Sequence, residues 1–235
     1  MATAAILAGG YGKRLRPLTH DTPKPLLTVG SKPILMWQIE LLRRYSVDNF
    51  VLCVGYRKES IKKALGDGSS LGVSISYAEE EEPLGTGGAI KNARRFLESE
   101  EYFFVLNGDI LTNLDPTPLT RHVGEHGLVA SIALVKLPSP YGIVYVGEND
   151  LVDRFVEKPL LPFWINAGVY CFSPEVFDYL PDKGDLERTT LPLLAEKKLL
   201  AAVRYKDVYW RSIDTHKDLD EARKEVSYLE RSLGS

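Results

Sequence analysis

Short apolar runs alternate with segments of helical apolar spacing through the first half of the chain. We predict strands at residues 3–8, 50–54, 73–77 and 102–106, and helices at residues 34–45, 59–65 and 87–97. Strands that alternate with helices in this way are typical of crossover units. The pattern therefore predicts a mainly parallel sheet covered by helices on both faces.

After about residue 128 the pattern changes, because strands follow one another with few helices between them. We predict strands at residues 129–137, 142–146, 151–156 and 169–172, and helices at residues 191–198 and 217–229. Such strands are typical of antiparallel additions, which would make the sheet mixed. No repeat or linker interrupts residues 1–235, so a single domain is expected.

The segment LAGGYGKRLRPLTHDTPKPL, residues 7–26, joins the first predicted strand to glycines and then to cations. Glycines allow backbone N–H groups to approach an anion closely, and such loops bind phosphate. Two common phosphate motifs are excluded. A Walker loop needs glycine in place of Leu7 and Ser or Thr in place of Arg14, and the dinucleotide fingerprint needs glycine in place of Leu15.

The pattern that remains, L-A-G-G-x-G-x-R-L-x-P-L-T followed by P-K-P, resembles the signature of the sugar-phosphate nucleotidyltransferases. The resemblance spans nearly the whole chain. It implies a Rossmann-like three-layer α/β/α fold and the joining of a nucleoside triphosphate to a sugar 1-phosphate with release of pyrophosphate. It also implies that residues 1–127 bind the nucleotide and that residues 128–235 bind the sugar phosphate.

The resemblance assigns catalytic roles to Arg14, Lys24 and Asp109, and a magnesium site to Asp109 and Asp214. Both aspartates follow strand-like runs, and two carboxylates with water and phosphate oxygens suit octahedral Mg²⁺. An Asp in that position is also a common helix cap, and Asp214 or Thr215 is suited to cap the last helix. The nucleotide-binding residues that the resemblance implies are Leu7, Ala8, Gly9, Gly10, Gly12, Lys13, Arg14, Glu80, Pro83, Gly85, Thr86, Asn107 and Gly108.

The loop YAEEEEPLGTGGA, residues 77–89, corresponds in the resemblance to the segment over the nucleobase. Thymidylyl and many uridylyl relatives carry glutamine where this chain has Glu80. A carboxylate only accepts hydrogen bonds, so it suits the adjacent donors of guanine and mismatches uracil and thymine. The four consecutive acids also fit a solvated face. GTP is the preferred triphosphate on this reasoning, and EEPLGTGG is similar to the loop of mannose-1-phosphate and heptose-1-phosphate guanylyltransferases.

Three further motifs match the sugar site of the family. They supply the sugar-phosphate-binding residues Tyr141, Gly142, Glu157, Lys158, Asn166 and Gly168. The expected reaction joins GTP and mannose 1-phosphate into GDP-mannose. Uridylyl or thymidylyl transfer to glucose 1-phosphate, heptose-1-phosphate guanylyl transfer and a catalytically silent regulatory homologue are the alternatives. A glycosyltransferase is disfavoured because the only D-x-D, residues 218–220, lies in a predicted helix. No left-handed β-helix domain is expected.

Composition adds only broad limits. Of 235 residues, 44% are hydrophobic and 26% charged, and the net charge of −3 favours neither nucleic acid nor an anionic membrane. No signal peptide or membrane-spanning segment is apparent. Cys53 and Cys171 lie in apolar runs, which predicts reduced core thiols and a cytoplasmic location. A homodimer through the later strands remains open.

Overall fold

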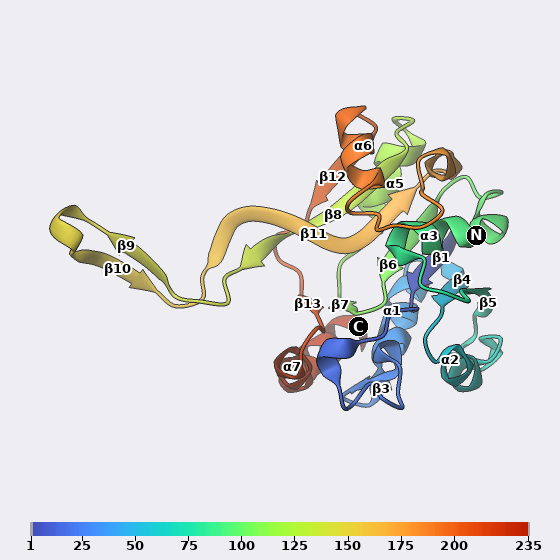
Figure 1. Ribbon diagram of the computed structural model, residues 1–235, viewed down its shortest axis with the longest axis horizontal. Helices are drawn as coiled ribbons and strands as arrows, with labels where there is room; N and C mark the ends of the chain where they lie inside the picture. Colours follow the sequence, from blue (N-terminus) through green and yellow to red (C-terminus); the bar gives the residue numbers. More distant parts are fainter. Residues whose placement is uncertain (1, 235) are drawn as a thin grey trace.

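Seven strands form the central sheet of the computed structural model, which describes residues 2–234. They lie in the order β12-β8-β11-β6-β1-β4-β5 (Figure 1). Their bounds are Leu200–Arg204 for β12, Ala130–Pro138 for β8, Leu160–Phe172 for β11, Phe103–Asn107 for β6, Ala2–Leu7 for β1, Val47–Val54 for β4 and Ser74–Glu79 for β5.

The sheet is mixed and mainly parallel, as the sequence predicts. β1 pairs in parallel with β4 and β6, β4 with β5, and β8 with β12. β11 is antiparallel to both of its neighbours, β6 and β8, so it alone runs against the others in this sheet. β11 begins nine residues before the strand predicted at 169–172, and β12 was not predicted. β12 is a half-exposed edge strand whose run, Leu-Ala-Ala-Val-Arg, comes four residues after α6 and contains two alanines, which are depleted in strands.

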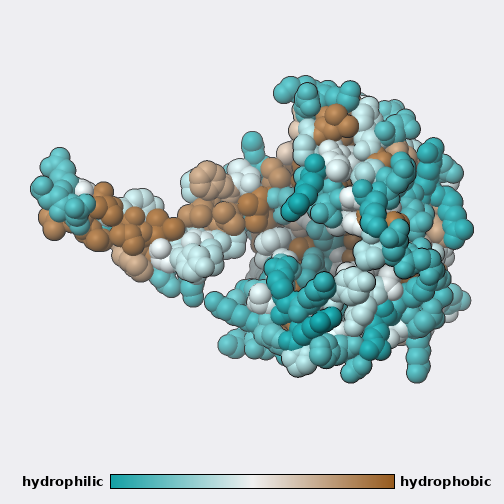
Figure 2. Space-filling model, viewed as in Figure 1, coloured by the Kyte–Doolittle hydropathy of each residue, from teal (hydrophilic) through white to brown (hydrophobic). Residues whose placement is uncertain are grey.

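An arm projects from the sheet between β8 and β11, and we define it as residues 141–160. It consists of the antiparallel strands β9 (Ile143–Val146) and β10 (Val152–Val156), with a short 3₁₀ turn, η4 (Glu148–Asp150), at its tip. Figure 1 shows the arm extending away from the rest of the molecule, and Figure 2 shows apolar side chains along it. Both strands were predicted, but their separation from the central sheet was not.

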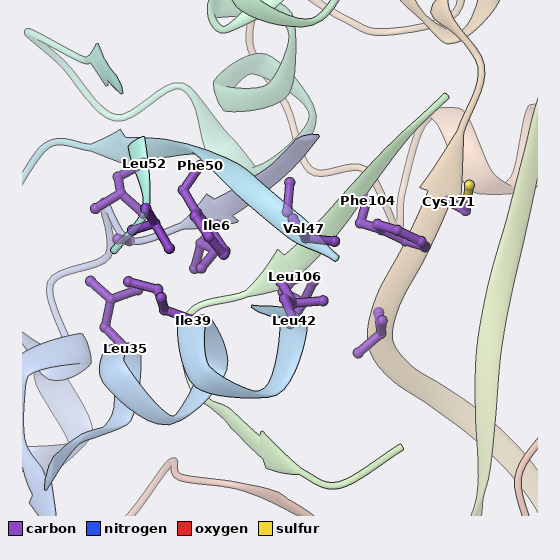
Figure 3. Packing of buried hydrophobic residues seen from close by; sticks show 14 of the residues in the cluster. Ile6, Leu35, Ile39, Leu42, Val47, Phe50, Leu52, Phe104, Leu106 and Cys171 are labelled. Atoms are coloured by element: carbon purple, nitrogen blue, oxygen red, sulfur yellow. The ribbon is translucent and has the colours of Figure 1, made fainter. Parts of the chain in front are cut away.

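Helices cover both faces of the sheet, because successive residues of a strand point to opposite sides. Ala4 and Ile6 of β1 pack with α1 (Ile34–Arg43), α2 (Lys58–Leu65) and α5 (Thr117–Gly124) in the cluster that Figure 3 shows in part. Ala5 packs on the other face with α3 (Gly85–Asn92), α4 (Arg94–Leu97) and α6 (Thr190–Glu196). The three-layer prediction is confirmed. The single helix predicted at residues 87–97 is two helices, and α5 was not predicted.

A third cluster packs the C-terminal helix α7 (His216–Gly234) against the outside of α1. Leu15, Ile213 and Leu219 are buried together in this cluster. The remaining elements are the strand pairs β2 (Thr28–Val29) with β3 (Lys32–Pro33) and β7 (Ile110–Thr112) with β13 (Trp210–Ser212), and the 3₁₀ helices η1 (Lys13–Leu15), η2 (Lys24–Leu26), η3 (Ser69–Leu71) and η5 (Pro174–Asp178). No helix among residues 2–234 combines the length and apolarity that crossing a bilayer requires.

Candidate active site

Strand register brings the predicted nucleotide loops to one edge of the sheet. Leu7, the last residue of β1, pairs with Asn107 on one side and with Cys53 on the other. The backbone N–H of Gly108 donates to the Leu7 carbonyl at 3.0 Å, and that of Ala8 donates to the Cys53 carbonyl at 2.8 Å. The loop after β1 therefore lies between the loops after β6 and β4, where ligands bind in parallel sheets.

The two predicted metal ligands meet because β7 and β13 are antiparallel. Asp109 directly precedes β7 and Asp214 follows β13, and Ser212 pairs with Ile110. The Asp109 carbonyl also accepts a hydrogen bond from the Ile213 N–H at 2.9 Å. Residues 105 positions apart in the chain are thus held side by side.

The cap of α7 is made by other residues, which leaves Asp214 free to face the site. The Thr215 N–H donates to Asp218 Oδ2 at 2.7 Å, and the Asp218 N–H donates to Thr215 Oγ1 at 3.3 Å. This reciprocal pair is a capping box. Of the two capping candidates in the sequence, Thr215 forms the cap.

Four charged side chains form one ionic array at this edge. Lys24 donates from Nζ to Asp109 Oδ2 at 2.6 Å and to Asp214 Oδ1 at 2.9 Å, and Arg14 Nη2 donates to the same Asp214 oxygen at 2.7 Å. The Lys24 side chain is only 13% exposed, whereas that of Arg14 is 69% exposed. The array therefore pairs a mostly buried lysine with two carboxylates, and pairs one of these carboxylates also with an arginine that is exposed to solvent.

The array also sets the charge of Asp214. Burial raises the pKa of Asp214, but hydrogen bonds from Lys24 and Ser212, together with the charges of Lys24 and Arg14, outweigh burial. The net result is a pKa below the usual value. Asp214 is therefore ionised at neutral pH and available to a cation.

A cavity of about 230 Å³ adjoins the array and is built for anions. It is lined by Leu7, Ala8, Gly10, Gly12, Lys13, Arg14, Lys24, Pro25, Gly108, Asp109 and Asp214. Gly12 adopts a left-handed conformation (φ 58°), and a Cβ there would lie 2.9 Å from Thr19 Cγ2 and 3.2 Å from Lys24 Cβ. Glycine at this position therefore allows the loop to pack directly against the lysine that carries the array.

A second cavity of about 280 Å³ shares Leu7, Gly10, Gly108 and Asp109 with the first. Its other lining residues are Gly9, Tyr11, Glu80, Pro83, Gly85, Thr86, Ala89, Asn107 and Asp185. Every predicted nucleotide-binding residue lines one of these two cavities.

Glu80 differs from the three other acids of its run. It is half-buried and accepts a hydrogen bond from the Leu84 N–H at 3.2 Å. Burial raises its pKa, and the Leu84 hydrogen bond offsets part of that rise. Glu79, Glu81 and Glu82 are exposed and form ion pairs with lysines. Position therefore distinguishes Glu80 as the acid that faces the cavity.

The predicted sugar-phosphate residues are more scattered. Lys158 lines a third cavity of about 610 Å³, whose wall also includes Asp214. Tyr141, with 76% of its surface exposed, and Glu157 lie in the arm, near where it joins the sheet. Gly142 lies there as well, and a Cβ on it would approach Glu157 Oε2 to 2.9 Å.

The other two predicted sugar-site residues, Asn166 and Gly168, lie within β11. Asn166 accepts from the Gly168 N–H at 2.8 Å and donates to the Tyr170 hydroxyl at 2.6 Å. Gly168 has a φ of 70°, and a Cβ on it would lie 2.9 Å from Asn107 Nδ2. Both residues therefore shape β11 where it passes Asn107, and their contacts in this structure are with the protein itself.

Several site residues were not identified from the sequence. Ser212 donates to Asp214 Oδ2 at 2.7 Å, and Gln38 donates from Nε2 to the carbonyls of Asn107 and Ile110, which holds the loop around Asp109. Tyr11 lines the Glu80 cavity and packs against Tyr56 with ring centroids 5.1 Å apart. Tyr11 could have been noticed in the sequence, because it is an aromatic residue between two glycines of the loop. The contacts of Gln38 depend on tertiary packing and have no signal in the sequence.

The donor set around Lys24 Nζ fits a divalent cation. One carboxylate oxygen of Asp109 and one of Asp214 lie on either side of this ammonium group. A metal ion in place of the ammonium group would contact the same two oxygens. Among residues 2–234 no group of three or more His, Cys, Asp or Glu is arranged to hold a metal. Two protein carboxylates are nevertheless enough for Mg²⁺ when phosphate and water supply the remaining oxygens.

Comparisons with known proteins show to which family the chain is similar. Mannose-1-phosphate guanyltransferase beta-B of Xenopus laevis is 39% identical over 223 residues, and mannose-1-phosphate guanyltransferase of Candida albicans is 40% identical over 223 residues. These matches cover 92% and 91% of this chain but 62% and 61% of the relatives, so the chain spans less than two thirds of their length.

Solved structures share the fold. HddC from Yersinia pseudotuberculosis complexed with GMP-PN has a TM-score of 0.75 and 29% identity, with coverage of 96% of this chain and all of that one. A putative glucose-1-phosphate thymidylyltransferase from Bacillus anthracis has a TM-score of 0.77 and 24% identity, with coverage of 95% of this chain and 94% of that one. The family model described as nucleotidyl transferase matches residues 3–228. With the glycine loop and the paired aspartates in place, this match shows that the chain belongs to the nucleotidyl transferase family.

Proposed function

We propose that the chain transfers a guanylyl group from GTP to mannose 1-phosphate, forming GDP-mannose and pyrophosphate. The observation that carries the proposal is the convergence of Lys24, Asp109 and Asp214 beside a glycine loop, with Glu80 in the adjoining cavity. The names of the Xenopus and Candida relatives support mannose 1-phosphate as acceptor. The GMP-PN in the HddC structure supports guanine.

The two adjoining cavities suit the two ends of a nucleoside triphosphate. The 230 Å³ cavity brings three cations and bare backbone to the phosphates, and the 280 Å³ cavity takes the base and ribose. Shared walls at Gly10 and Gly108 let one ligand run through both. On this proposal, residues 1–127 supply most of the nucleotide site.

Glu80 supports the choice of guanine. Its Oε2 accepts from the Leu84 N–H, so the loop orients the carboxylate towards the cavity. A carboxylate accepts from both the N1–H and the exocyclic amine of guanine, whereas uracil and thymine offer two carbonyl acceptors around one donor. A half-buried carboxylate facing a carbonyl is costly, so the mismatch discriminates strongly.

The sugar phosphate is assigned to the 610 Å³ cavity, which residues 128–235 line and which Asp214 borders. Lys136, Lys158 and Lys206 lie in its wall and supply positive charge. Lys158 is the residue that the sequence motif identifies for the sugar phosphate. The cavity is continuous with the ionic array through Asp214, so an acceptor bound there is directed to the triphosphate.

The reaction needs positioning and charge stabilisation more than acid–base chemistry. A phosphate oxygen of the sugar phosphate attacks the α-phosphorus, forming a new P–O bond, and the bond from that phosphorus to the α–β bridging oxygen breaks. The attacking oxygen is already anionic, so no protein base is required. Lys24 and Arg14 neutralise the charge that develops on the leaving pyrophosphate.

Asp109 and Asp214 would hold a Mg²⁺ ion once Lys24 turns towards phosphate. When bound, the ion supplies Lewis-acid stabilisation of phosphate oxygens. Ser212 then fixes the rotamer of Asp214 through its hydrogen bond to Oδ2.

The test is a matrix of GTP, ATP, CTP, UTP and dTTP against mannose, glucose and heptose 1-phosphates, with pyrophosphate release as readout. The proposal expects the highest kcat/KM for GTP with mannose 1-phosphate, and loss of turnover in Asp109→Asn. Preference for UTP or dTTP would overturn the base assignment. Nucleotide-sugar binding without turnover at any pairing would identify a silent homologue instead.

A further inference from the structure

The arm exposes more apolar surface than any other part of the molecule that Figure 2 shows. Exposed large apolar side chains between residues 141 and 163 are Tyr141, Val144, Tyr145, Val146, Leu151, Val152, Phe155, Leu160 and Phe163, all between 44% and 76% exposed. Contiguous apolar patches beyond a few hundred Å² mark interaction sites. A two-stranded hairpin alone in water is also only marginally stable. The arm therefore has the character of a surface that a partner covers.

The apolar side chains of the arm are gathered on one face. Val144 lies opposite Phe155 and Val146 lies opposite Val152, and residues paired across two strands point to the same side. Regular alternation would place Val152 and Phe155 on opposite faces. The register shift between residues 152 and 154 corrects this, so that both join the Val144 and Val146 face.

The other face of the arm is polar enough for water. Arg154 lies opposite Tyr145, with its guanidinium carbon 4.0 Å from the centre of the ring. The Val144–Phe155 face is apolar except at the base of the arm, where Glu157 lies on the same side, next to Gly142. The opposite face carries the charged Arg154 with Tyr145, and the partly buried Ile143 and Val156.

The size of the exposed surface suits a homodimer. Four of the nine exposed side chains, Val144, Val146, Val152 and Phe155, lie on the face to be covered. A specific interface takes ~800 Å² from each partner, so a dimer that covers this face also buries the tip and the base of the arm. A two-fold axis brings the same face of two copies together, which requires a self-complementary surface. The apolar part of this face, from Val146 to Phe155, meets that requirement.

Charge sets the direction in which two arms would lie. The tip of the arm carries Glu148, Asp150 and Asp153. The wall of the cavity at its base carries five cations, Lys136, Lys158, Lys206, Arg211 and Lys217, against three acids, Asp214, Asp218 and Glu221, so its net charge is positive. Antiparallel arms place each acidic tip beside the lysines of the other copy, whereas parallel arms place acid against acid. Opposite charges across an interface fix such a register.

We infer that the arm binds the arm of a second copy of this chain, antiparallel, with the Val144–Phe155 faces in contact and each tip beside the other copy's base. The inference does not depend on the proposed reaction. It has a consequence for the site, since the base of the arm borders the cavity that Lys158 and Asp214 line. Each copy's tip would then form part of the mouth of its partner's cavity.

The base of the arm opposes the alternative in which the arm folds back over its own cavity. The Ser139 N–H donates to the Pro159 carbonyl at 2.9 Å, Ser139 Oγ donates to the Tyr141 carbonyl at 2.7 Å, and Leu160 pairs with Pro138. These contacts direct the arm along the continuation of β8 and β11. Folding back would break them.

Sedimentation velocity over a range of protein concentrations tests the inference. The wild-type chain is expected to be a dimer, and Phe155→Asp is expected to weaken association about 30-fold or more, as loss of an interface hot spot does. Phe155 is 61% exposed within one copy, so circular dichroism and the melting temperature should stay near wild type if assembly contributes little to folding. The matched control is Leu193→Asp, an exposed leucine on α6 outside the arm, which should remain dimeric.

Charge reversal tests the antiparallel direction. Glu148→Lys with Asp150→Lys should weaken the dimer, and adding Lys136→Glu with Lys206→Glu in the same chain should restore it. A monomeric wild-type chain, or a Phe155→Asp variant that dimerises as wild type does, would overturn the inference. Protection of the arm from hydrogen exchange only after GTP is added to a monomer would identify a lid instead. Reversal without effect on association would overturn the antiparallel arrangement.

Discussion

Lys24 donates to Asp109 at 2.6 Å from a position in which only 13% of its side chain is exposed. The same ammonium group reaches Asp214, which also accepts from Arg14, so both predicted metal ligands are paired with protein cations in this structure. A charge that is largely buried is costly without its partner. On the proposed function, a nucleotide therefore competes with the two aspartates for Lys24.

Loss of Lys24 should impair the proposed reaction more than it changes folding. Lys24→Ala is expected to lower kcat by on the order of 10²–10³, because the charge that stabilises the leaving pyrophosphate is absent. Arg16→Ala removes an exposed cation two residues from Arg14 and is the matched control, with activity expected near wild type. Pyrophosphate release measures both. Equal losses in the two variants would show that the loop's overall charge matters, not Lys24.

Metal binding without nucleotide should report the same competition. In Lys24→Met, Asp109 loses its cation and Asp214 keeps only the exposed Arg14, so Mn²⁺ is expected to bind the free variant more tightly than the free wild type. Adding Asp214→Asn to that variant should remove the gain. Electron paramagnetic resonance of Mn²⁺ titrations reads binding directly and needs no turnover. Identical Mn²⁺ affinity in wild type and Lys24→Met would contradict the competition.

Glu80→Gln should relax the choice of nucleobase. A hydrogen bond to a charged group contributes about 1.5–3 kcal/mol, so the preference for GTP over UTP is expected to fall about 10- to 100-fold. Glu81→Gln is the matched control, since Glu81 is exposed and pairs with Lys58. The measurement is the ratio of kcat/KM values for the two triphosphates. A ratio that does not change in Glu80→Gln would refute the role of the carboxylate.

The depressed pKa of Asp214 predicts a pH-dependent contribution to stability. An acid whose folded pKa lies below its unfolded value stabilises the fold above the unfolded pKa, about 3.9 for Asp, and the contribution is lost as pH falls through the folded pKa. Asp214→Asn should therefore be less stable than wild type at pH 7. The difference should shrink as the pH is lowered towards and below 4. Urea unfolding at several pH values measures it, and a constant difference would exclude ionisation as the cause.

The sequence was sufficient to place the glycine loop and residues 107–109 at one edge of the sheet, because the signals there are local. The glycines, the cations and the buried strands that precede Gly9 and Asn107 all lie in short segments, and parallel strands deliver their carboxyl ends to one edge. The meeting of Asp109 with Asp214 required more, since it depends on the pairing of β7 with β13 across 100 residues. No periodicity in the sequence encodes that pairing.

The later half shows why local patterns were insufficient. Residues 143–146 and 152–156 have the alternation of sheet strands, and nothing in that pattern indicates that they pair only with each other. The resemblance pointed to Glu80 among four consecutive acids, but its place in the cavity wall depends on where β5 ends and on the lysines of α2 and residue 183 that pair with the other three. Tyr141 and Glu157 were both predicted for the sugar site, and both lie in the arm.

Alanine should lower the stability of the fold at Gly108 but not at Gly10. A Cβ on Gly108 would lie 2.3 Å from the Leu7 carbonyl oxygen, whereas a Cβ on Gly10 would meet nothing within 4 Å. Gly108→Ala is therefore expected to cost about 1–3 kcal/mol, the usual cost of overpacking, or about 2–4 °C in Tm for each kcal/mol. Gly10→Ala should keep the wild-type Tm.

Gly10→Ala should instead affect the ligand. Gly10 lines both the phosphate cavity and the base cavity, so a methyl group there projects into the path of the triphosphate. We expect a raised KM for GTP and a nearly unchanged KM for mannose 1-phosphate, because the proposed acceptor site is the cavity that Lys158 lines. Thermal melts and initial rates on the two variants separate folding from binding. A Gly10→Ala variant that melts early, or that binds GTP as wild type does, would show that the loop adopts a different conformation around the phosphates.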